Sequence, residues 1–414
     1  MTAVCTTRVA HHSVRDLCGA FPGAARDGLS VLWRDAAGGW FVADRPVVAV
    51  KACGPRRWEI LRREVGGRAF EVVSDPGLEP VAMPRWWTGL AFDEEVEGDW
   101  VPFGAARATL FGRTRGVLPD GRGFEQTVEG LSPVEPGAGP GPAAAPQGVP
   151  PRYAELVGRA IEACESGRLE KVVVSGTRDV AADRCVAVAT ALSRLAERFE
   201  GCSVFGFAVG DQVFAGATPE LLVGVSDRRV ASMALAGSAP RGGAHDAARI
   251  EALASSLKEQ AEHAFVRHAV AARLGPLCDE VSTTPSPRVW TLPNIHHLRS
   301  DVTAVAHDGV GILDLAERLQ PTPAVCGMPH EAARAFIRSA DGPSRGWYAG
   351  SVGWVDASGN GELAVALRSA LIGPRGARLF AGVGVVRGSD ISAELAETDA
   401  KFSVMLDALR PEAP

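Results

Sequence analysis

Two pairs of glutamates have the residue type and the spacing to bind a hard metal ion. Glu259 and Glu262 lie in SLKEQAEHAFV, and Glu394 and Glu397 lie in SAELAETDAKF. Both segments have helical periodicity, and residues three apart share one face of a helix. If the two helices meet, four carboxylates converge, and such oxygen ligands suit Mg²⁺ better than zinc or iron. The pairs therefore predict a magnesium site and an anionic substrate; the alternative is two solvated helix faces.

Two further side chains have the chemistry of a base and an acid. Lys171 opens the apolar run KVVVSG, where a desolvated amine would lose its charge more easily and could act as a base. Glu220 follows Thr218 and Pro219 among apolar residues, where a desolvated carboxyl could keep its proton and act as an acid. Each also has a simpler interpretation, as an edge-strand lysine that reaches water or as an exposed acid in a turn.

Two segments rich in small residues could bind a carboxylate through their backbone. They are LAGSAPRG at residues 235–242 and FAGVGVVRG at residues 380–388. Free N–H groups in such segments can surround an anion, although either segment could equally be a simple turn.

The elements that must position these residues form a mixed pattern after residue 151. Helical periodicity occurs at residues 152–166, 185–199, 311–319, 329–337 and 390–409, and in one long helix from about 246 to 274. Strand patterns lie between them, in runs such as CSVFGFAV, VWTLPNIHHL, LAVALRSALI and RLFAGVGVV. Strand runs joined by hairpins, with helices inserted, predict an α+β fold of large antiparallel sheets flanked by helices, not a doubly wound parallel sheet.

Composition and charge bound the class of protein. The 414 residues are 46% hydrophobic and 22% charged, which is typical of a globular protein with an ample core. We divide the chain into a β-rich part at residues 1–132, a Pro/Gly/Ala-rich linker at residues 133–150, and a region at residues 151–414 that carries every candidate residue. A formal net charge of -6 without a long basic run argues against nucleic acid or an anionic membrane as partner, so we expect a small molecule.

The cysteines and the N-terminus indicate the compartment. The 8 cysteines are scattered without a C-x-x-C motif, so neither a zinc site nor a disulfide framework is indicated. The N-terminal segment MTAVCTTRVAHHSVRDL has no apolar signal core, and no window approaches the ~18 apolar residues of a membrane span. We therefore expect a cytoplasmic protein.

Nine segments in uninterrupted order resemble the chorismate-utilising enzymes. This family includes isochorismate synthase, salicylate synthase and the synthase subunits that form anthranilate and aminodeoxychorismate. The resemblance runs from about residue 152 to 409 and rests on KVVVSG, FAGATPELLV, ALAGSAPRG, KEQAEHAFV, NIHHLRSDV, LQPTPAVCGMPHEAA, YAGSVGWVDASGNGELAVALRSALI, RLFAGVGVVRGS and AELAETDAKF. It implies the chorismate-binding fold of anthranilate synthase component I, chorismate as substrate, and a monomer, the state of many members of this type.

The resemblance also implies how the four glutamates divide their work. Glu262 and Glu397 match direct Mg²⁺ ligands, whereas Glu259 and Glu394 match residues that contact the waters of the metal. The metal would hold the ring carboxylate of chorismate, and Lys401, one helical turn beyond Glu397, would add positive charge beside it.

Other matched positions would bind the rest of the substrate. Arg368 and Tyr348 match the residues that bind the enolpyruvyl carboxylate, where a guanidinium suits a planar pair of oxygens. The backbone around Gly382, Gly384 and Val385 would line the same pocket. In the other small-residue segment, substrate contact is expected at Ser238.

The chemistry implied by the resemblance is a hydroxyl transfer. Lys171 would remove a proton from a water that attacks C2 of chorismate, and Glu220 would give a proton to the departing C4 hydroxyl. His297 in NIHHL matches an active-site histidine near that hydroxyl; otherwise it is a core histidine bonded to backbone. The product would be isochorismate, formed with Mg²⁺ and without a redox cofactor.

The choice among family members depends on PTPAVCG. Ala324 and Val325 stand where aminating members have a more polar residue, and this apolar pair resembles isochorismate synthases that serve catechol siderophore or menaquinone formation. Salicylate synthase, which also eliminates pyruvate, is the first alternative, and an aminating subunit is the second. A non-catalytic chorismate binder is disfavoured because it would need neither Lys171 nor Glu220.

Three departures from the family pattern predict an altered substrate contact or rate. Gly176 stands where the family more often has arginine, and Gln320 stands where histidine is common before PTPA. The helix of the first glutamate pair reads KEQAEH in place of KDR-x-EH.

Overall fold

The computed structural model describes residues 2–21, 28–134, 153–242, 245–340 and 344–411. All but the first two residues of the predicted linker, Pro133 and Val134, lie outside these ranges, so the division of the chain at that point stays a prediction.

The first part of the chain is mainly strands. Its helices are α1 (Val14–Ala20) and α2 (Arg57–Gly66). Its strands are β1 (Ala3–Val9), β2 (Leu29–Arg34), β3 (Trp40–Ala52), β4 (Phe70–Ser74), β5 (Trp86–Leu90), β6 (Ala106–Val117) and β7 (Gly123–Glu129).

The second part alternates strands and helices. Its strands are β8 (Lys171–Ala181), β9 (Ser203–Val209), β10 (Gln212–Thr218), β11 (Leu221–Ser226), β12 (Arg229–Pro240), β13 (Cys278–Thr283), β14 (Arg288–Thr291), β15 (Ile295–Ala306), β16 (Gly327–Met328), β17 (Ser351–Val355), β18 (Gly361–Val365), β19 (Ser369–Gly373) and β20 (Gly376–Val386). Its helices are α3 (Tyr153–Glu165), α4 (Val188–Arg198), α5 (Asp246–Ser255), α6 (Leu257–Leu274), α7 (Ile312–Leu319), α8 (His330–Ala340) and α9 (Ile391–Leu409).

The strands of both parts join in one hydrogen-bonded system. Within the described ranges the pairings are antiparallel except that of β1 with β4. Two ladders connect the parts: β2 pairs with β9, and β5 pairs with β17. The predicted α+β class with large antiparallel sheets is therefore confirmed.

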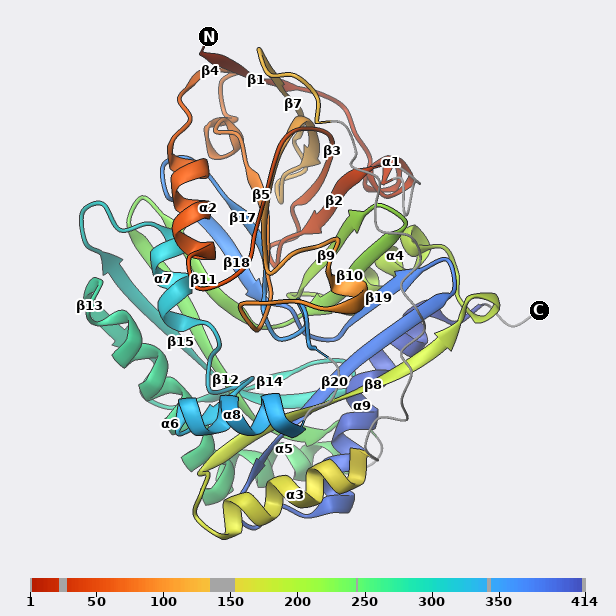
Figure 1. Ribbon diagram of the computed structural model, residues 1–414, viewed down its shortest axis with the longest axis vertical. Helices are drawn as coiled ribbons and strands as arrows, with labels where there is room; N and C mark the ends of the chain where they lie inside the picture. Colours follow the sequence, from red (N-terminus) through yellow and green to blue (C-terminus); the bar gives the residue numbers. More distant parts are fainter. Residues whose placement is uncertain (1, 22–27, 135–152, 243–244, 341–343, 412–414) are drawn as a thin grey trace.

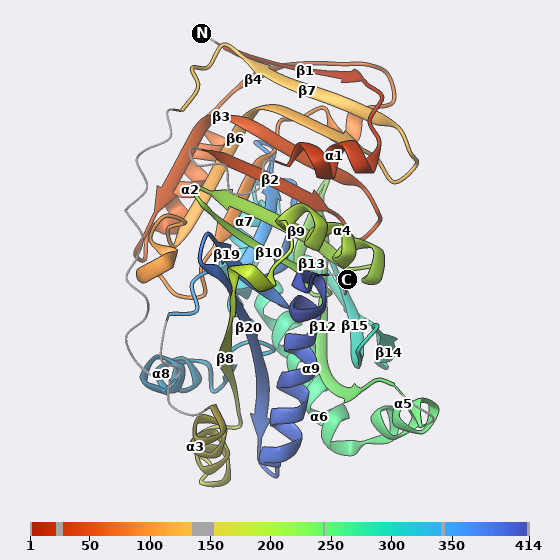
Figure 2. The same ribbon diagram turned by 90° about the vertical axis from the view of Figure 1, so that its right-hand side faces the viewer.

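The helices that carry the candidate residues lie away from the N-terminal strands. Figure 1 shows β1, β4 and β7 at one end of the molecule, and α3, α6, α8 and α9 at the other. After a turn of the view, α9 runs beside β20, with α6 on its other side (Figure 2). Strands β8 and β20 pair along 11 residues each, which gives these helices a long and regular support.

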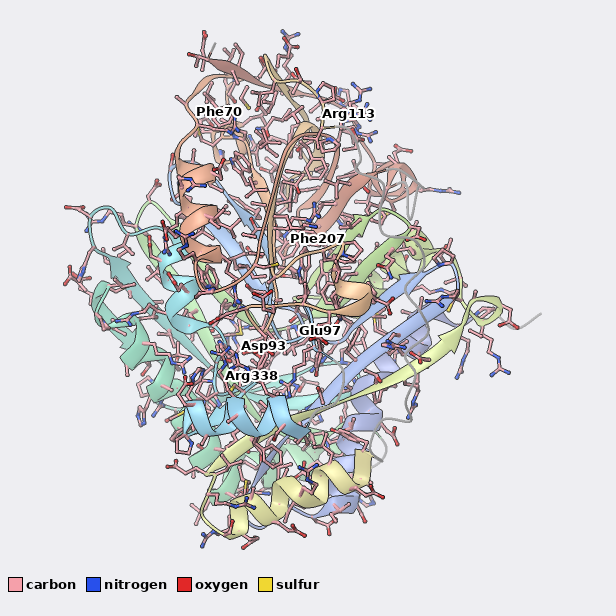
Figure 3. The ribbon with its side chains drawn as sticks, in the orientation of Figure 1. Phe70, Asp93, Glu97, Arg113, Phe207 and Arg338 are labelled. Carbon is pink, nitrogen blue, oxygen red and sulfur yellow. The ribbon has the colours of Figure 1, made fainter. Side chains whose placement is uncertain are left out.

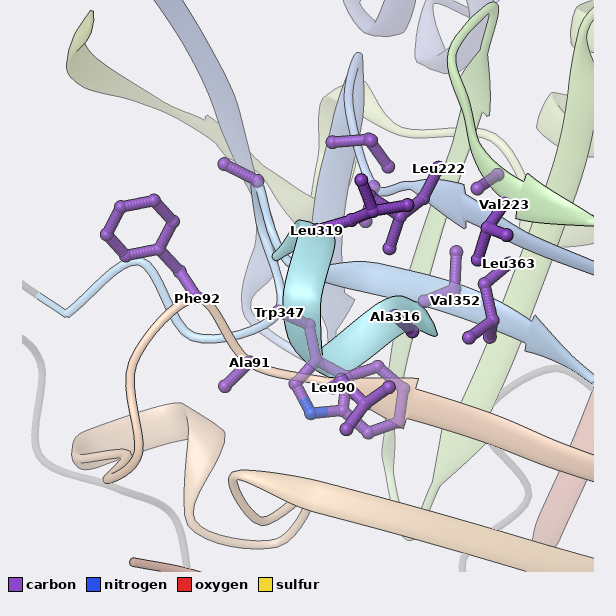
Figure 4. Close-up of a cluster of buried hydrophobic side chains, with 14 of the residues drawn as sticks. Leu90, Ala91, Phe92, Leu222, Val223, Ala316, Leu319, Trp347, Val352 and Leu363 are labelled. Carbon is purple, nitrogen blue, oxygen red and sulfur yellow. The ribbon is translucent and has the colours of Figure 1, made fainter. Parts of the chain in front are cut away.

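Aromatic side chains form the core between the two parts. Trp33, Trp86, Trp87 and Trp347 are each at most 1% exposed. Figure 4 shows Trp347 beside Leu90, with aliphatic side chains from the second part around them. A Cβ at Gly89 would lie 2.0 Å from the Trp347 ring, so this close packing requires glycine there. Large buried rings of this kind contribute strongly to packing energy.

Polar contacts at the surface also join the two parts. Arg338 on α8 and Asp93, which follows β5, lie near each other (Figure 3), and Arg338 Nη2 is 3.1 Å from Asp93 Oδ1. None of the helices in the described ranges combines the length and the hydropathy that crossing a membrane requires.

Two predicted elements are wrong in their extent. The single helix expected at residues 246–274 is two helices, because Ser256 has extended geometry (φ -66°, ψ 113°) and its hydroxyl caps α6 by accepting the N–H of Glu259. The predicted strand LAVALRSALI is interrupted between β18 and β19, where Arg368 has a φ of 49°. Positive φ is uncommon for a residue with a side chain and ends regular strand geometry.

Candidate active site

A cavity lies between α6, α9 and the strands that face them. It holds about 510 Å³ of empty space, its open mouth included. The residues that line it are Lys171, Leu235, Ala236, Gly237, Ser238, Lys258, Glu259, Glu262, His297, Ala324, Gly384, Glu394, Glu397 and Lys401.

All four glutamates of the two predicted pairs line this cavity. The pair from α6 and the pair from α9 are brought together from positions 135 residues apart in the sequence. The structure thus favours one shared carboxylate cluster over two separate solvated helix faces.

Two lysines neutralise part of this cluster. Lys171 Nζ lies 2.6 Å from Glu262 Oε1, and Lys401 Nζ lies 2.7 Å from Glu397 Oε1. Burial opposes ionisation of Glu397, yet the charge and hydrogen bonds of Lys401, with a hydrogen bond from Ser238, lower the pKa of Glu397 to about 2. Glu397 is therefore a carboxylate at any physiological pH.

The other two carboxyl groups have raised pKa values, so their ionisation is unfavourable. Burial, together with the negative charge of Glu397, raises the pKa of Glu394 to about 7. Burial and then the charge of Glu262 raise the pKa of Glu259, whose Oε2 accepts the N–H of Ser238 at 3.2 Å. Carboxylates crowded in this way repel one another, and a cation among them would relieve the repulsion.

The donor set fits Mg²⁺ in type and in location. Four hard carboxylates face one small cavity, which is the ligand chemistry that Mg²⁺ prefers. Within the part of the chain that the structure describes, however, no three His, Cys, Asp or Glu side chains are already grouped as ligands of one ion. The lysine contacts explain why these side chains are not already grouped as ligands. Glu262 and Glu397 each contact an ammonium group that a metal would have to replace.

His297 and Arg368 form a buried pair at the back of the site. Arg368 Nη2 donates to His297 Nε2 at 2.7 Å, so the other ring nitrogen, Nδ1, carries the proton and faces Gly237 O at 3.4 Å. Burial, together with the positive charges of Arg368 and Lys401, lowers the pKa of His297 to about 3. His297 is therefore a neutral imidazole of fixed tautomer.

Arg368 also has a hydrogen-bond donor that no described residue accepts. It is 6% exposed, and its Nη1 is buried with no hydrogen-bond partner among the described residues. An unmet buried donor is unfavourable unless a ligand accepts from it. A substrate carboxylate is a suitable acceptor for such a guanidinium.

Glu220 is buried at the junction after β10. It is 4% exposed, and burial raises its pKa to about 7, although the nearby charges of Lys171 and Arg368 oppose the rise. Its backbone carbonyl accepts the N–H of Val365 at 2.9 Å, which fixes the junction against β18. A carboxyl group with this pKa can give a proton near neutral pH.

The glycines of β20 let other groups approach the strand. A Cβ at Gly384 would lie 3.0 Å from Lys171 Cε, and one at Gly382 would lie 3.0 Å from Tyr348 Oη. Lys401 Nζ donates to Gly382 O at 2.9 Å, and the Tyr348 ring stacks on Phe380 with 5.4 Å between centroids. A Cβ at Gly382 would also lie 2.7 Å from the backbone oxygen of Val174, so glycine is a steric requirement there, whereas at Gly384 the nearest atoms belong to the flexible Lys171 side chain.

Several predicted substrate contacts do not line the cavity as it stands. Ala324 does, but its neighbour Val325 is 3% exposed and points into the core. The side chain of Val385 is likewise fully buried. Glu220, Tyr348, Arg368 and Gly382 lie behind the lining residues rather than among them.

Two residues near the site had not been predicted. Lys258 lines the cavity one residue before Glu259, and its charge lowers the pKa that Glu259 and Glu394 would otherwise have. Arg345, 4% exposed, donates to Val173 O and Val325 O at 2.6 and 2.9 Å, and so fixes the PTPAVCG segment against β8. Lys258 was visible as a basic residue beside a predicted ligand, whereas no sequence signal marked Arg345.

The Gln320 departure has a structural explanation. Its amide Nε2 donates to Ala91 O at 2.7 Å, and its Oε1 accepts the hydroxyl of Ser351 at 2.6 Å. Gln320 thus joins two strand ends of different parts of the chain and does not line the cavity.

This chain is similar in sequence to known proteins. The family model described as "Chorismate binding enzyme" matches residues 142–410, more than half of the chain. The chain is 37% identical over 260 residues to the salicylate biosynthesis isochorismate synthase of Pseudomonas aeruginosa, a match that covers 61% of this chain and 53% of that protein. It thus spans about half the length of that relative.

Two further relatives agree. Isochorismate synthase DhbC of Bacillus subtilis is 37% identical over 270 residues, which cover 63% of this chain and 68% of that protein. The crystal structure of a putative 2,3-dihydroxybenzoate-specific isochorismate synthase from Bacillus anthracis superposes with a TM-score of 0.76 at 27% identity, and covers 95% of this chain and 98% of that one. This chain therefore belongs to the chorismate-binding enzyme family.

Proposed function

We propose that the protein is a Mg²⁺-dependent isochorismate synthase, which converts chorismate to isochorismate. The observation that supports this most is the placement of Glu220. Its buried carboxyl has a pKa of about 7, and it lies close enough to Lys171 and Arg368 for their charges to affect that pKa. A protein that only binds a dicarboxylate has no need of a protonated buried acid beside two cations. Hydroxyl transfer needs such an acid.

The reaction divides between a base and an acid. Lys171 takes a proton from water as the water oxygen bonds to C2. The diene shifts, the C4–O bond breaks, and Glu220 gives its proton to the departing hydroxyl. Water enters and water leaves, so no oxidant or reductant is required.

The ion pair of Lys171 constrains when it can act. Its 2.6 Å contact with Glu262 is that of an ammonium with a carboxylate. Lys171 can accept a proton only after this contact loosens and its own proton leaves. In the substrate complex, Lys171 and Glu262 must therefore be further apart than they are in this structure.

The remaining residues hold the substrate. Arg368 would bind the enolpyruvyl carboxylate through its unmet Nη1, with Tyr348 beside it. His297, which is neutral and fixed by Arg368, would orient the C4 hydroxyl. The four glutamates would hold Mg²⁺, which when bound supplies positive charge to the ring carboxylate.

The apolar Ala324 at the cavity wall favours water over ammonia as nucleophile. It offers no hydrogen bond that would select an amine. The relatives named above as isochorismate synthases are consistent with this choice.

The test is product analysis. Purified protein is incubated with chorismate and Mg²⁺, with and without an ammonium salt, and the products are separated by chromatography. Isochorismate is the expected product in both samples. Salicylate with pyruvate would assign the lyase reaction, an aminated product would assign the synthase-subunit reaction, and unchanged chorismate despite Mg²⁺-dependent binding would overturn the enzymatic proposal.

A further inference from the structure

Gly176 and Tyr153 are packed against each other outside the cavity. Gly176 lies in β8, and the ring of Tyr153, the first residue of α3, lies over it. A Cβ at Gly176 would lie 3.0 Å from Tyr153 Cδ2 and 3.2 Å from Cε2, closer than ordinary contacts between carbons. Any larger side chain at position 176 would have to displace the ring.

The hydroxyl of Tyr153 reaches two elements at once. Tyr153 Oη lies 3.1 Å from Thr398 Oγ1 on α9 and 3.3 Å from Val174 O on β8. Thr398 is 2% exposed and donates its own proton to Glu394 O at 2.9 Å, so Tyr153 gives its single hydroxyl proton to Thr398 Oγ1, and Val174 O is a close neighbour of the hydroxyl. The three groups form a directed chain of hydrogen bonds that ends at the backbone of Glu394.

The Tyr153 ring on Gly176 of β8 and the Tyr153 hydroxyl on Thr398 of α9 connect the two elements that carry opposite sides of the site. Strand β8 begins with Lys171, and α9 carries Glu394 and Glu397 on the turn that Thr398 follows. Helix α3 packs against β8, β20 and α9. Figure 2 shows α3 at the lower end of the molecule, next to β8. A shift of α9 along β8 would move two of the four carboxylates relative to Lys171.

We propose that Tyr153 is a positioning residue that fixes α9 against β8, and that glycine at position 176 provides the space for its ring. The link itself follows from packing alone. Its consequence for magnesium rests on the proposed function, because it assumes that the carboxylates of α9 help to bind the ion.

The first test measures magnesium binding directly. Tyr153→Phe keeps the ring and removes the hydroxyl, and Thr398→Val removes the acceptor at constant shape. Each should raise the Kd for Mg²⁺, measured by calorimetry without substrate, by about 2- to 10-fold, the effect of losing one hydrogen bond. The double variant should bind no worse than the weaker single variant, because both remove the same contact. Glu155→Gln, an exposed change in the same turn of α3, should leave the Kd unchanged.

The second test isolates the steric contact by thermal unfolding, without metal or substrate. Gly176→Ala should lower the Tm in the wild-type background, where the new Cβ meets the ring, and should not lower it in the Tyr153→Ala background. Comparing the two backgrounds cancels the intrinsic effect of alanine in a strand. If Tyr153→Ala does not fold, the Tm values of Tyr153→Phe, Thr398→Val and the double variant measure the coupling across the hydrogen bond instead.

The two tests separate this inference from the proposed function. Equal effects of Gly176→Ala in both backgrounds, or additive effects of Tyr153→Phe and Thr398→Val on Tm, would overturn the link. Coupled effects on Tm with an unchanged Mg²⁺ Kd would overturn its positioning role. A wild-type protein that made a product other than isochorismate would contradict the proposed function and leave the link between β8 and α9 standing.

Discussion

The two ends of the site control charge in opposite ways. At the carboxylate end, formed by the four glutamates of α6 and α9, Lys171 of β8 pairs with Glu262 at 2.6 Å and Lys401, itself on α9, pairs with Glu397 at 2.7 Å. At the buried end, formed by Glu220, His297 and Arg368, burial is the largest influence on protonation: the pKa of Glu220 is raised to about 7 and that of His297 is lowered to about 3.

This difference indicates a division of labour. Paired, ionised groups are suited to hold ions, since they keep their charge and exchange partners. Buried groups with shifted pKa values are suited to move protons, because a small change in surroundings changes their protonation. Metal binding is thus expected at the carboxylate end and proton donation to the substrate at the buried end, and the variants below test that separation.

The largest effect is expected for Glu220→Gln, which removes the proton donor and keeps the shape. The kcat should fall by about 10²- to 10⁴-fold, the usual contribution of general acid catalysis. Steady-state kinetics with chorismate measures this. Glu362→Gln is the matched control, because burial also raises the pKa of Glu362 to about 7, but the charges near Glu362 are those of Asp35 and Arg85, not those of Lys171 and Arg368. Equal losses in the two variants would show that the loss is structural.

At the carboxylate end, Glu397→Gln should act on metal binding. The Kd for Mg²⁺ should rise by at least about 100-fold, because the variant loses a proposed direct ligand and leaves Lys401 without its partner. Calorimetry measures the Kd, and Glu259→Gln should cost less, about 10-fold, as a residue behind the metal's waters. The separation of the two ends would break down if Glu397→Gln bound Mg²⁺ normally and lost only kcat.

Arg368→Lys tests substrate binding at the buried end. A lysine keeps the charge but loses the planar fork and the contact with His297, so KM for chorismate should rise by about 10- to 100-fold. The Mg²⁺ Kd should not change. A rise in the Mg²⁺ Kd to match that in KM would show that the ends are not independent.

The pH profile gives the smallest effect in this series. Glu220 must be protonated to act, and its pKa is about 7, so kcat should fall by about 10-fold for each pH unit above 7. The residual rate of Glu220→Gln should lack this fall, whereas Glu362→Gln should keep it. A wild-type kcat that is flat from pH 7 to 9 would contradict the assignment of Glu220 as the acid.

The carboxylate end could be predicted from sequence more fully than the buried end. The i, i+3 spacing places each glutamate pair on one helix face whatever the rest of the fold. Lys401 could be predicted beside Glu397, one helical turn away, but the pairing of Lys171 with Glu262 could not, because these residues are 91 positions apart and only the tertiary fold brings them together. The break between α5 and α6 was available as the signal Ser-x-x-Glu at Ser256, which continuous helical periodicity obscured.

At the buried end the residue types could be read from the sequence, but the burial and contacts that set their protonation could not. The apolar neighbours of Glu220 suggested a desolvated carboxyl, and the structure gives the burial that this interpretation needs. The positive φ of Arg368, its unmet Nη1 and its contact with His297 depend on where β18 stops and β19 begins. No local pattern in the sequence encodes that position, and the same is true of the packing of Tyr153 on Gly176.

An isotope experiment tests the central claim, water attack with loss of the C4 hydroxyl, most directly. Chorismate is converted in H₂¹⁸O with Mg²⁺, and isochorismate is analysed by mass spectrometry. One ¹⁸O should appear at C2 in every product molecule, and Glu220→Gln should form this product at least about 100-fold more slowly. Unlabelled isochorismate, or labelled product formed by Glu220→Gln at the wild-type rate, would contradict the account.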